Sequence, residues 1–206
     1  MKNQLIIRFL AVLACLVFSF VSIPAQSAKQ VKQIDAYRGQ LDTFINRNKN
    51  RHPVFADVSD YRKDEQAVWK KYGSVDSFKR ASKDLESYQI ADLWERNERI
   101  VVADFSYFTP SGDWAQFAKH YYREDGTLAK VESQLNVFGL EGLISVYRNL
   151  YFDQKGKLLR KTAKYYDHEA KEWRKADQVH FMDRQLEIYK TTKELPFAAL
   201  LNKAQG

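Results

Sequence analysis

The sequence has almost no cysteine. Its only one, Cys15, lies in an apolar stretch near the start of the 206 residues. No internal disulfide can therefore form, and a chain cut after residue 27 has no thiol for nucleophilic catalysis or for a zinc–thiolate site. A protein exported without disulfides must obtain its stability from its hydrophobic core alone. The chain also lacks low-complexity tracts and an obvious linker.

Motifs of catalysis and of cofactor binding are missing as well. No Gly-x-Ser-x-Gly elbow, phosphate-binding glycine loop, His-Glu-x-x-His sequence or calcium loop occurs. Asp167, His168 and Glu169 are adjacent in an expected turn, and Glu124-Asp125 precedes a turn glycine, so both groups are typical of turns. We therefore expect no enzyme, no cofactor and no bound metal. A Ser/His/Asp triad stays open, because its members need not be adjacent in sequence.

The N-terminus has the pattern of a signal peptide. A positively charged start is followed by an apolar run over 9–23 and by small residues at a possible cleavage site. We expect 1–27 to be a cleavable signal peptide and 28–206 to be a single domain, periplasmic or secreted. The alternatives are an uncleaved anchor and a lipoprotein acylated at Cys15, although apolar residues continue past that cysteine.

The net charge is mildly positive. Removing 1–27 leaves 31 basic and 26 acidic residues, a net charge of +5 (31 − 26). Basic and acidic residues are interleaved along the chain and do not form blocks, which favours solubility over nucleic-acid binding. We therefore expect no nucleic acid as a partner, and contact with a membrane only through the signal segment before its cleavage.

A repeat occupies the second half of the chain. Four times between Tyr107 and Trp173, an aromatic pair is followed by a short polar turn and a return into another strand. The pairs are Tyr107-Phe108, Tyr121-Tyr122, Tyr151-Phe152 and Tyr165-Tyr166. Aromatic residues favour strands, and the glycine in the first three turns supplies the positive φ that tight hairpins need. The repeat predicts an antiparallel meander of β-hairpins.

Units of the form Tyr-Tyr-x-x-x-Gly-x-Leu, as in 121–128, resemble the short hairpin repeats of MORN-type proteins. The resemblance covers at most 107–173 and implies hairpins. The denser glycine pattern of that family is absent, since Gly126 and Gly156 are 30 positions apart. The resemblance therefore implies no function.

The residues before the repeat have the hydrophobic period of helices. An apolar stripe predicts an amphipathic helix over 28–48. A second helix is expected from a cap at Ser59 or Asp60 to Gly73, and Ser74 begins a third. These three segments predict that 28–88 forms a helical part of the domain.

From about Ile90 the period changes from 3.6 to 2, as in strands. Expected strands cover 89–95, 99–109, 113–123, 127–138, 142–153, 157–167, 173–182 and 185–191. Because sheets twist, a long meander is expected to close into a barrel or to curl around another element.

The sequence therefore predicts an α+β fold. N-terminal helices pack against a long, curled antiparallel β-meander of about seven or eight strands, half-barrel or barrel-like, over 89–191. A short C-terminal helix or tail is expected over 192–206.

Alternation along the strands sorts the side chains into a core face and a polar face. Exposed aromatics beside arginine and histidine suit the binding of sugars, anionic groups or a peptide. The candidate ligand-binding residues of this polar face are Trp114, His120, Tyr122, Arg148, Arg160, Tyr166 and His180. The same side chains could instead form cross-strand pairs that shield a solvated sheet, each stabilising it by about 0.2–1 kcal/mol.

Taken together, these patterns predict an exported, non-catalytic binding protein or a structural protein of the cell envelope, with an unknown ligand. The partner is an unidentified envelope component, a protein or an amphipathic small molecule. The alternative is a periplasmic carrier of an apolar or amphipathic small molecule in a half-closed sheet, which needs an apolar cavity on the order of several hundred Å³.

Overall fold

The computed structural model describes residues 26–49, 52–60, 63–64, 66–82, 88–140 and 142–201. The expected signal peptide lies outside these residues except for its last two positions, so its cleavage stays a prediction. Among the described residues, no helix combines the length and the apolar character needed to cross a membrane.

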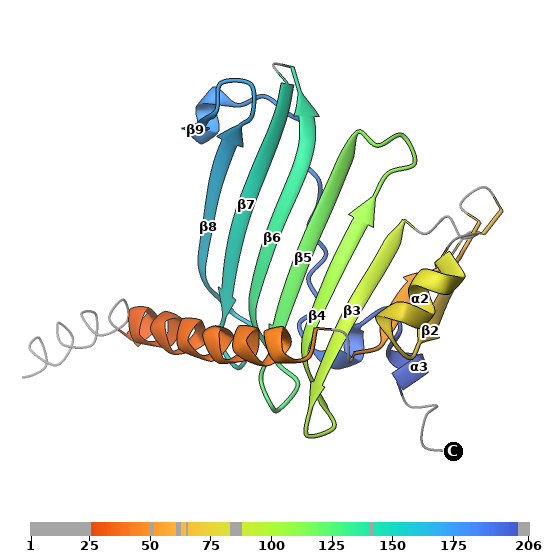
Figure 1. Ribbon diagram of the computed structural model, residues 1–206. Helices are drawn as coiled ribbons and strands as arrows, with labels where there is room; N and C mark the ends of the chain where they lie inside the picture. The colour runs from red at the N-terminus through yellow and green to blue at the C-terminus, as the bar shows by residue number, and fades with distance from the viewer. Residues whose placement is uncertain are drawn as a thin grey trace, which may run out of the picture.

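Within the described residues, nine strands form one antiparallel sheet in the order β2-β1-β3-β4-β5-β6-β7-β8-β9 (Figure 1). The strands are β1 (Val54–Asp57), β2 (Trp69–Tyr72), β3 (Gln89–Arg96), β4 (Arg99–Phe108), β5 (Trp114–Tyr122), β6 (Leu128–Gly139), β7 (Gly142–Phe152), β8 (Leu158–Asp167) and β9 (Glu172–Arg174). The helices are the N-terminal helix over 26–47, α2 (Val75–Ala81), α3 (Ala198–Leu201) and the short 3₁₀ turns η2 (Ala176–Gln178) and η3 (Thr192–Glu194). The fold is α+β, with the N-terminal helix packed on a meander.

The expectation that the sheet closes or curls strongly is wrong. The sheet is open and not strongly curled (Figure 1). A sheet needs to wrap around its helices only if they must fill its interior. Here the two faces of the sheet are covered by different parts of the chain, the N-terminal helix on one side and a C-terminal segment on the other. Each cover buries its own apolar residues without closure of the sheet.

The helical part is shorter than expected. The helix predicted to end at Gly73 is wrong, because β2 occupies its last turn and pairs with β1. The helix expected after Ser74 is confirmed as α2, in which Ser74 and Ser77 form a reciprocal capping box. The expected continuation of this helix over 83–87 lies outside the described residues.

The last two expected strands are also corrected. Of 173–182 only β9 pairs with the sheet, and 185–191 is not a strand. Instead, residues 179–197, named here the C-terminal strap, cross the face opposite the N-terminal helix (Figure 1). The strap packs apolar side chains on that face, namely Val179, Phe181, Leu186, Ile188, Tyr189, Leu195 and Phe197. An extended segment lying on a sheet has the same alternation as a strand within it.

Three hairpins carry an extra residue where the N-terminal helix crosses them. The register shifts between β3 and β4, between β5 and β6, and between β7 and β8, which leaves Val101, Ala129 and Leu159 without a partner. Val101 packs in one cluster with Leu41 of the helix, and Ala129 and Leu159 pack in another with Ile34. A β-bulge turns a side chain out of the regular alternation. These bulges therefore supply the apolar surface on which the helix lies.

A buried ammonium also fixes the helix. The Lys130 side chain is 5% exposed, and its Nζ lies 2.8 Å from Asp35 Oδ1 of the helix and 2.9 Å from Glu132 Oε1. Burial acts to lower the pKa of Lys130, but hydrogen bonds to the two carboxylates outweigh it, and the pKa is raised. Arg38 of the helix adds a second contact to Glu132 at 3.1 Å. The position of the helix is thus set by charge as well as by packing.

Candidate functional site

The seven residues predicted to bind a ligand are distributed over both faces of the sheet. Strand register and cluster contacts place four of them on the strap side: Trp114, His120, Tyr122 and Arg148. Arg160 and Tyr166 are on the side of the N-terminal helix, and His180 is an exposed residue of the strap itself. The single polar face expected from the sequence is therefore not formed, and ligand binding by these residues stays a prediction.

His120 and Tyr122 hold the strap. Both side chains are fully buried. The Tyr122 hydroxyl donates to the Tyr189 carbonyl at 3.1 Å, while the His120 ring lies between two carbonyls, with Nδ1 3.2 Å from Ala118 O and Nε2 3.2 Å from Glu187 O. Burial lowers the pKa of His120 to about 4, although both carbonyls favour the charged ring. A neutral imidazole has one N–H, so it satisfies one of these acceptors at a time.

Arg148 and Trp114 also contact the strap. Arg148 Nη2 donates to Asp183 Oδ1 and forms an ion pair with that carboxylate. The Arg184 guanidinium lies 5.1 Å from the centroid of the Trp114 ring, within cation–π range. The predicted residues on this side thus contribute to the packing of the strap.

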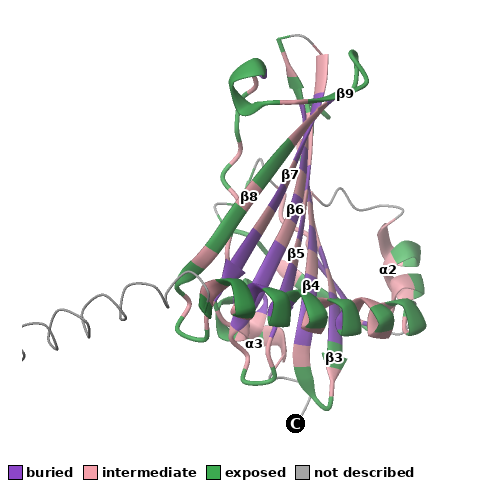
Figure 2. Cartoon of the chain, turned by 90° about the vertical axis from the view of Figure 1, so that its left-hand side faces the viewer, coloured by how far each residue is buried: buried purple, intermediate pink, exposed green. Residues whose placement is uncertain are grey.

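The described residues cover the other side of the sheet only in part. The N-terminal helix crosses one end of the strands, and the strands continue well beyond it (Figures 1 and 2). Strand register arranges the side chains beyond the helix in three rows. The row nearest the helix contains Asp104, Lys119, Glu132, Asn149 and Thr162. The middle row contains Ser106, Phe117, Gln134, Tyr147 and Lys164. The far row contains Phe108, Ala115, Asn136, Ser145, Tyr166 and Trp173.

The charges of the nearest row are paired. Lys119 Nζ lies 3.0 Å from Asp104 Oδ2, and burial raises the pKa of Asp104 despite this contact. Burial also acts to raise the pKa of Glu132, but Lys130 and Arg38 outweigh it, and the pKa is lowered. A hollow of about 420 Å³ lies over this row and the middle one, with Phe117 and Tyr147 among its lining residues.

Uncharged hydrogen-bonding groups and aromatic rings meet at the far end of this side. We name the aromatic–amide patch by its members: Gln134, Asn136, Ser145, Tyr147, Tyr166, His168 and Trp173. Asn136 Oδ1 accepts from Gln134 Nε2 at 2.9 Å and from the Ser145 hydroxyl at 2.7 Å. Trp173 is 59% exposed, and its ring centroid lies 5.7 Å from that of Tyr147 and 5.3 Å from that of Tyr166.

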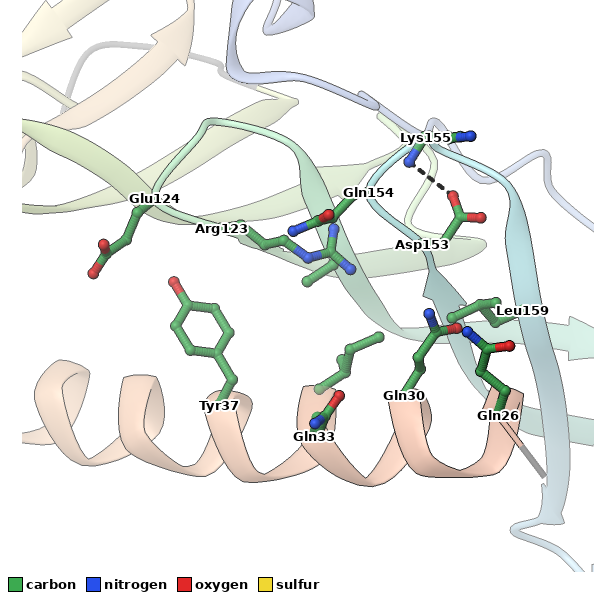
Figure 3. Close-up of a pocket in the computed structure, with 12 residues that line it drawn as sticks. Gln26, Gln30, Gln33, Tyr37, Arg123, Glu124, Asp153, Gln154, Lys155 and Leu159 are labelled. Atoms are coloured by element: carbon green, nitrogen blue, oxygen red, sulfur yellow. Dashed lines mark hydrogen bonds between the residues drawn. The ribbon is translucent and has the colours of Figure 1, made fainter.

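A second hollow, of about 710 Å³, lies between the N-terminal helix and two hairpin turns (Figure 3). Its lining from the helix includes Gln26, Gln30, Gln33 and Tyr37, and its lining from the turns includes Arg123, Glu124, Asp153, Gln154 and Lys155. Ile34, Ala129 and Leu159 add apolar surface. The Arg123 guanidinium donates to the carbonyls of Leu128, at 2.6 Å, and Phe152, at 2.5 Å, so that it ties the two turns together.

One serine–histidine pair occurs in the aromatic–amide patch. Ser145 Oγ lies 2.7 Å from His168 Nε2, but the serine hydroxyl donates its proton to Asn136. His168 must then donate in the second bond, whereas a nucleophilic serine needs a histidine that accepts its proton. A second histidine, His52, pairs with a carboxylate, with Nε2 2.8 Å from Asp92 Oδ1. Among the described residues, no three histidine, cysteine or carboxylate side chains group as metal ligands do.

Comparison with known proteins gives no relative from which a function could be transferred: no family model, no curated protein and no solved structure matches the chain.

Proposed function

We propose that the protein is an exported, non-catalytic binding protein whose ligand is a neutral saccharide. The ligand lies on the aromatic–amide patch and extends into the hollow beside it. The main support for this proposal is the composition of this end of the sheet. There, amide and hydroxyl groups lie beside the clustered rings of Tyr147, Tyr166 and Trp173. Sugar rings present apolar C–H faces and many hydroxyls, so they require flat aromatic surfaces together with uncharged hydrogen-bonding groups.

The exposure of Trp173 supports a ligand at this place. An indole buries about 150–250 Å² when covered, so an exposed one in contact with two further rings forms a large apolar surface rimmed by polar groups. The ion pairs of the nearest row neutralise the charges closest to the hollow. A neutral ligand suits this environment better than a strongly charged one, because it does not need to disrupt these pairs.

The alternative carrier of an apolar molecule is less well supported. Phe105 and Tyr107, which would line an internal cavity, are buried in a packed cluster. The hollow between the N-terminal helix and the two hairpin turns is lined by apolar residues and, around them, by polar side chains of both the helix and the turns (Figure 3). These observations favour binding at the surface of the sheet.

The proposal is tested by calorimetric titration with a panel of neutral hexose and N-acetylhexosamine oligosaccharides. We expect at least one to bind, and Trp173→Ala to weaken that binding at least about tenfold, or 1.4 kcal/mol. Gln134→Ala should weaken it less, because one neutral hydrogen bond contributes about 0.5–1.5 kcal/mol.

Met182→Ala is the matched control. It removes an apolar side chain that is 68% exposed on the strap, outside the patch, and should leave the affinity unchanged. Absence of binding across the panel, or equal affinities of the wild type and Trp173→Ala, would show that the patch is not a saccharide site.

A further inference from the structure

We propose that the outer edge of β8 is a docking site for an extended acidic segment of another protein, which pairs with β8 as an additional strand. The inference rests on a backbone edge that pairs with no other strand of the described residues and on the sign of the charges beside it. It concerns the edge of the sheet and not the aromatic–amide patch, although Lys164 lies near both, with its Nζ 5.9 Å from the centroid of the Trp173 ring.

The edge of β8 is open over most of its length. β9 pairs with Tyr165, Tyr166 and Asp167 only, out of the ten residues of β8. Of the remaining residues, Leu158 and 160–164 pair with β7 on one side, and none of 158–164 has a strand on the other side among the described residues. Figure 2 looks toward this edge and shows β8 largely exposed. Every second residue of such an edge presents its N–H and C=O outward, which is a template for a further strand.

The charges along the edge have one sign. Residues 154–166 contain no aspartate or glutamate, and their basic residues are Lys155, Lys157, Arg160, Lys161 and Lys164. None of these five forms an ion pair with a carboxylate of the described chain. The interleaving of charges found elsewhere in the sequence is thus interrupted at the strand whose edge is free.

The charge selects the partner. Charged side chains of either sign discourage an exposed edge from pairing with itself. A set of only positive charges also determines which strand can pair with the edge. It attracts a strand that carries acidic residues and repels a second copy of β8. Lys161 pairs in register with Leu150 on the strap side and Lys164 with Tyr147 on the helix side, so the cations flank the edge on both faces. An incoming acidic strand can therefore satisfy backbone and side-chain groups together.

The test uses a synthetic peptide of alternating Glu and Val, about seven residues long to match the free part of β8. Amide hydrogen exchange of the full chain is measured with and without this peptide, and its affinity is measured by titration. We expect the peptide to slow the exchange of alternate amides within 158–164. The double variant Lys161→Glu/Lys164→Glu should bind it at least about tenfold more weakly, because like charges are then opposed.

Two controls separate strand addition from simple charge attraction. The same peptide N-methylated at every backbone nitrogen keeps its charge but cannot donate to a strand, and it should not bind. Lys70→Glu/Lys71→Glu reverses two exposed cations on β2, at the opposite edge of the sheet, and should leave the affinity unchanged. Equal binding of the methylated peptide, unchanged affinity of the β8 variant, no binding, or a dimer of the chain through β8 would each overturn the proposal.

Discussion

Two single residues, Gly126 and Gly156, allow two of the hairpin turns to form. Gly126 and Gly156 have φ values of +80° and +75°, in the region that residues with a Cβ rarely adopt. A Cβ at Gly126 would also lie 3.0 Å from Oγ1 of Thr192 in the strap, whereas at Gly156 the nearest atom is Lys190 Cδ at 3.5 Å. The two turn glycines therefore have the positive φ that the predicted tight hairpins need.

We expect Gly126→Val and Gly156→Val to lower the free energy of unfolding by about 1–3 kcal/mol, with the larger loss at Gly126. Urea unfolding followed by circular dichroism measures the difference. Gly39→Ala is the control, because Gly39 lies within the N-terminal helix with no atom near its added Cβ, and alanine should stabilise by about 0.5–1 kcal/mol there. Unchanged unfolding midpoints for both valine variants would contradict the role assigned to the turns.

His120 links a single side chain to the pH dependence of stability. Its pKa is lowered from 6.5 to about 4 in the folded protein because burial disfavours the imidazolium. Between these pH values the unfolded chain binds a proton that the folded chain does not, so stability falls as the pH falls through this window. The full contribution is present above pH 6.5 and amounts to about 3 kcal/mol.

Replacing His120 by Gln should therefore flatten the pH dependence of the unfolding free energy between pH 7 and 4, compared with wild type. Parallel urea titrations across this range give the comparison. His180→Gln, at an exposed position of the strap, is the control and should retain the wild-type slope. If both variants follow the wild-type curve, the buried neutral histidine is not the source of the acid sensitivity.

Among the elements, the strap shows where sequence patterns are ambiguous. Leu186 and Ile188 alternate with polar residues as they would in a strand, but they pack on the sheet without joining its edge. Alternation reports that every second side chain is buried, not which backbone supplies the hydrogen bonds. The hairpins of β4 to β8, in contrast, were predictable because their turn chemistry is local, as at Gly126.

The end of the strap is expected to contribute strongly to stability. Phe197 is 1% exposed and stacks on Phe55 of β1, with ring centroids 4.1 Å apart. Phe197→Ala should lower the free energy of unfolding by about 3–5 kcal/mol, because it leaves a cavity under the strap. Met182→Ala, on an exposed part of the same strap, should change it by less than about 0.5 kcal/mol. A loss below about 1 kcal/mol for Phe197→Ala would mean that the strap is not part of the core.

For the whole molecule, the two separate covers of the sheet decide where a site can form. The sequence places Trp114, His120 and Tyr122 on one face of β5, but it does not reveal that a strap from residues 179–197 covers that face. The acceptors for His120 and Tyr122 are strap carbonyls distant in sequence, so local patterns contain no signal for them. Conversely, Gln134 and Asn136 show the alternation of a polar face, and only the register across strands brings them near the rings.

Ligand binding on the helix side of the sheet, beyond the N-terminal helix, is tested by mapping backbone amide shifts by NMR. The full chain is titrated with the neutral oligosaccharide that binds most tightly in calorimetry. We predict shifts in β6 to β9, centred on Asn136, Tyr147 and Trp173, with the strap unaffected. Shifts confined to the strap, or to the hollow around Tyr37 and Gln154, would show that the ligand binds elsewhere in the fold.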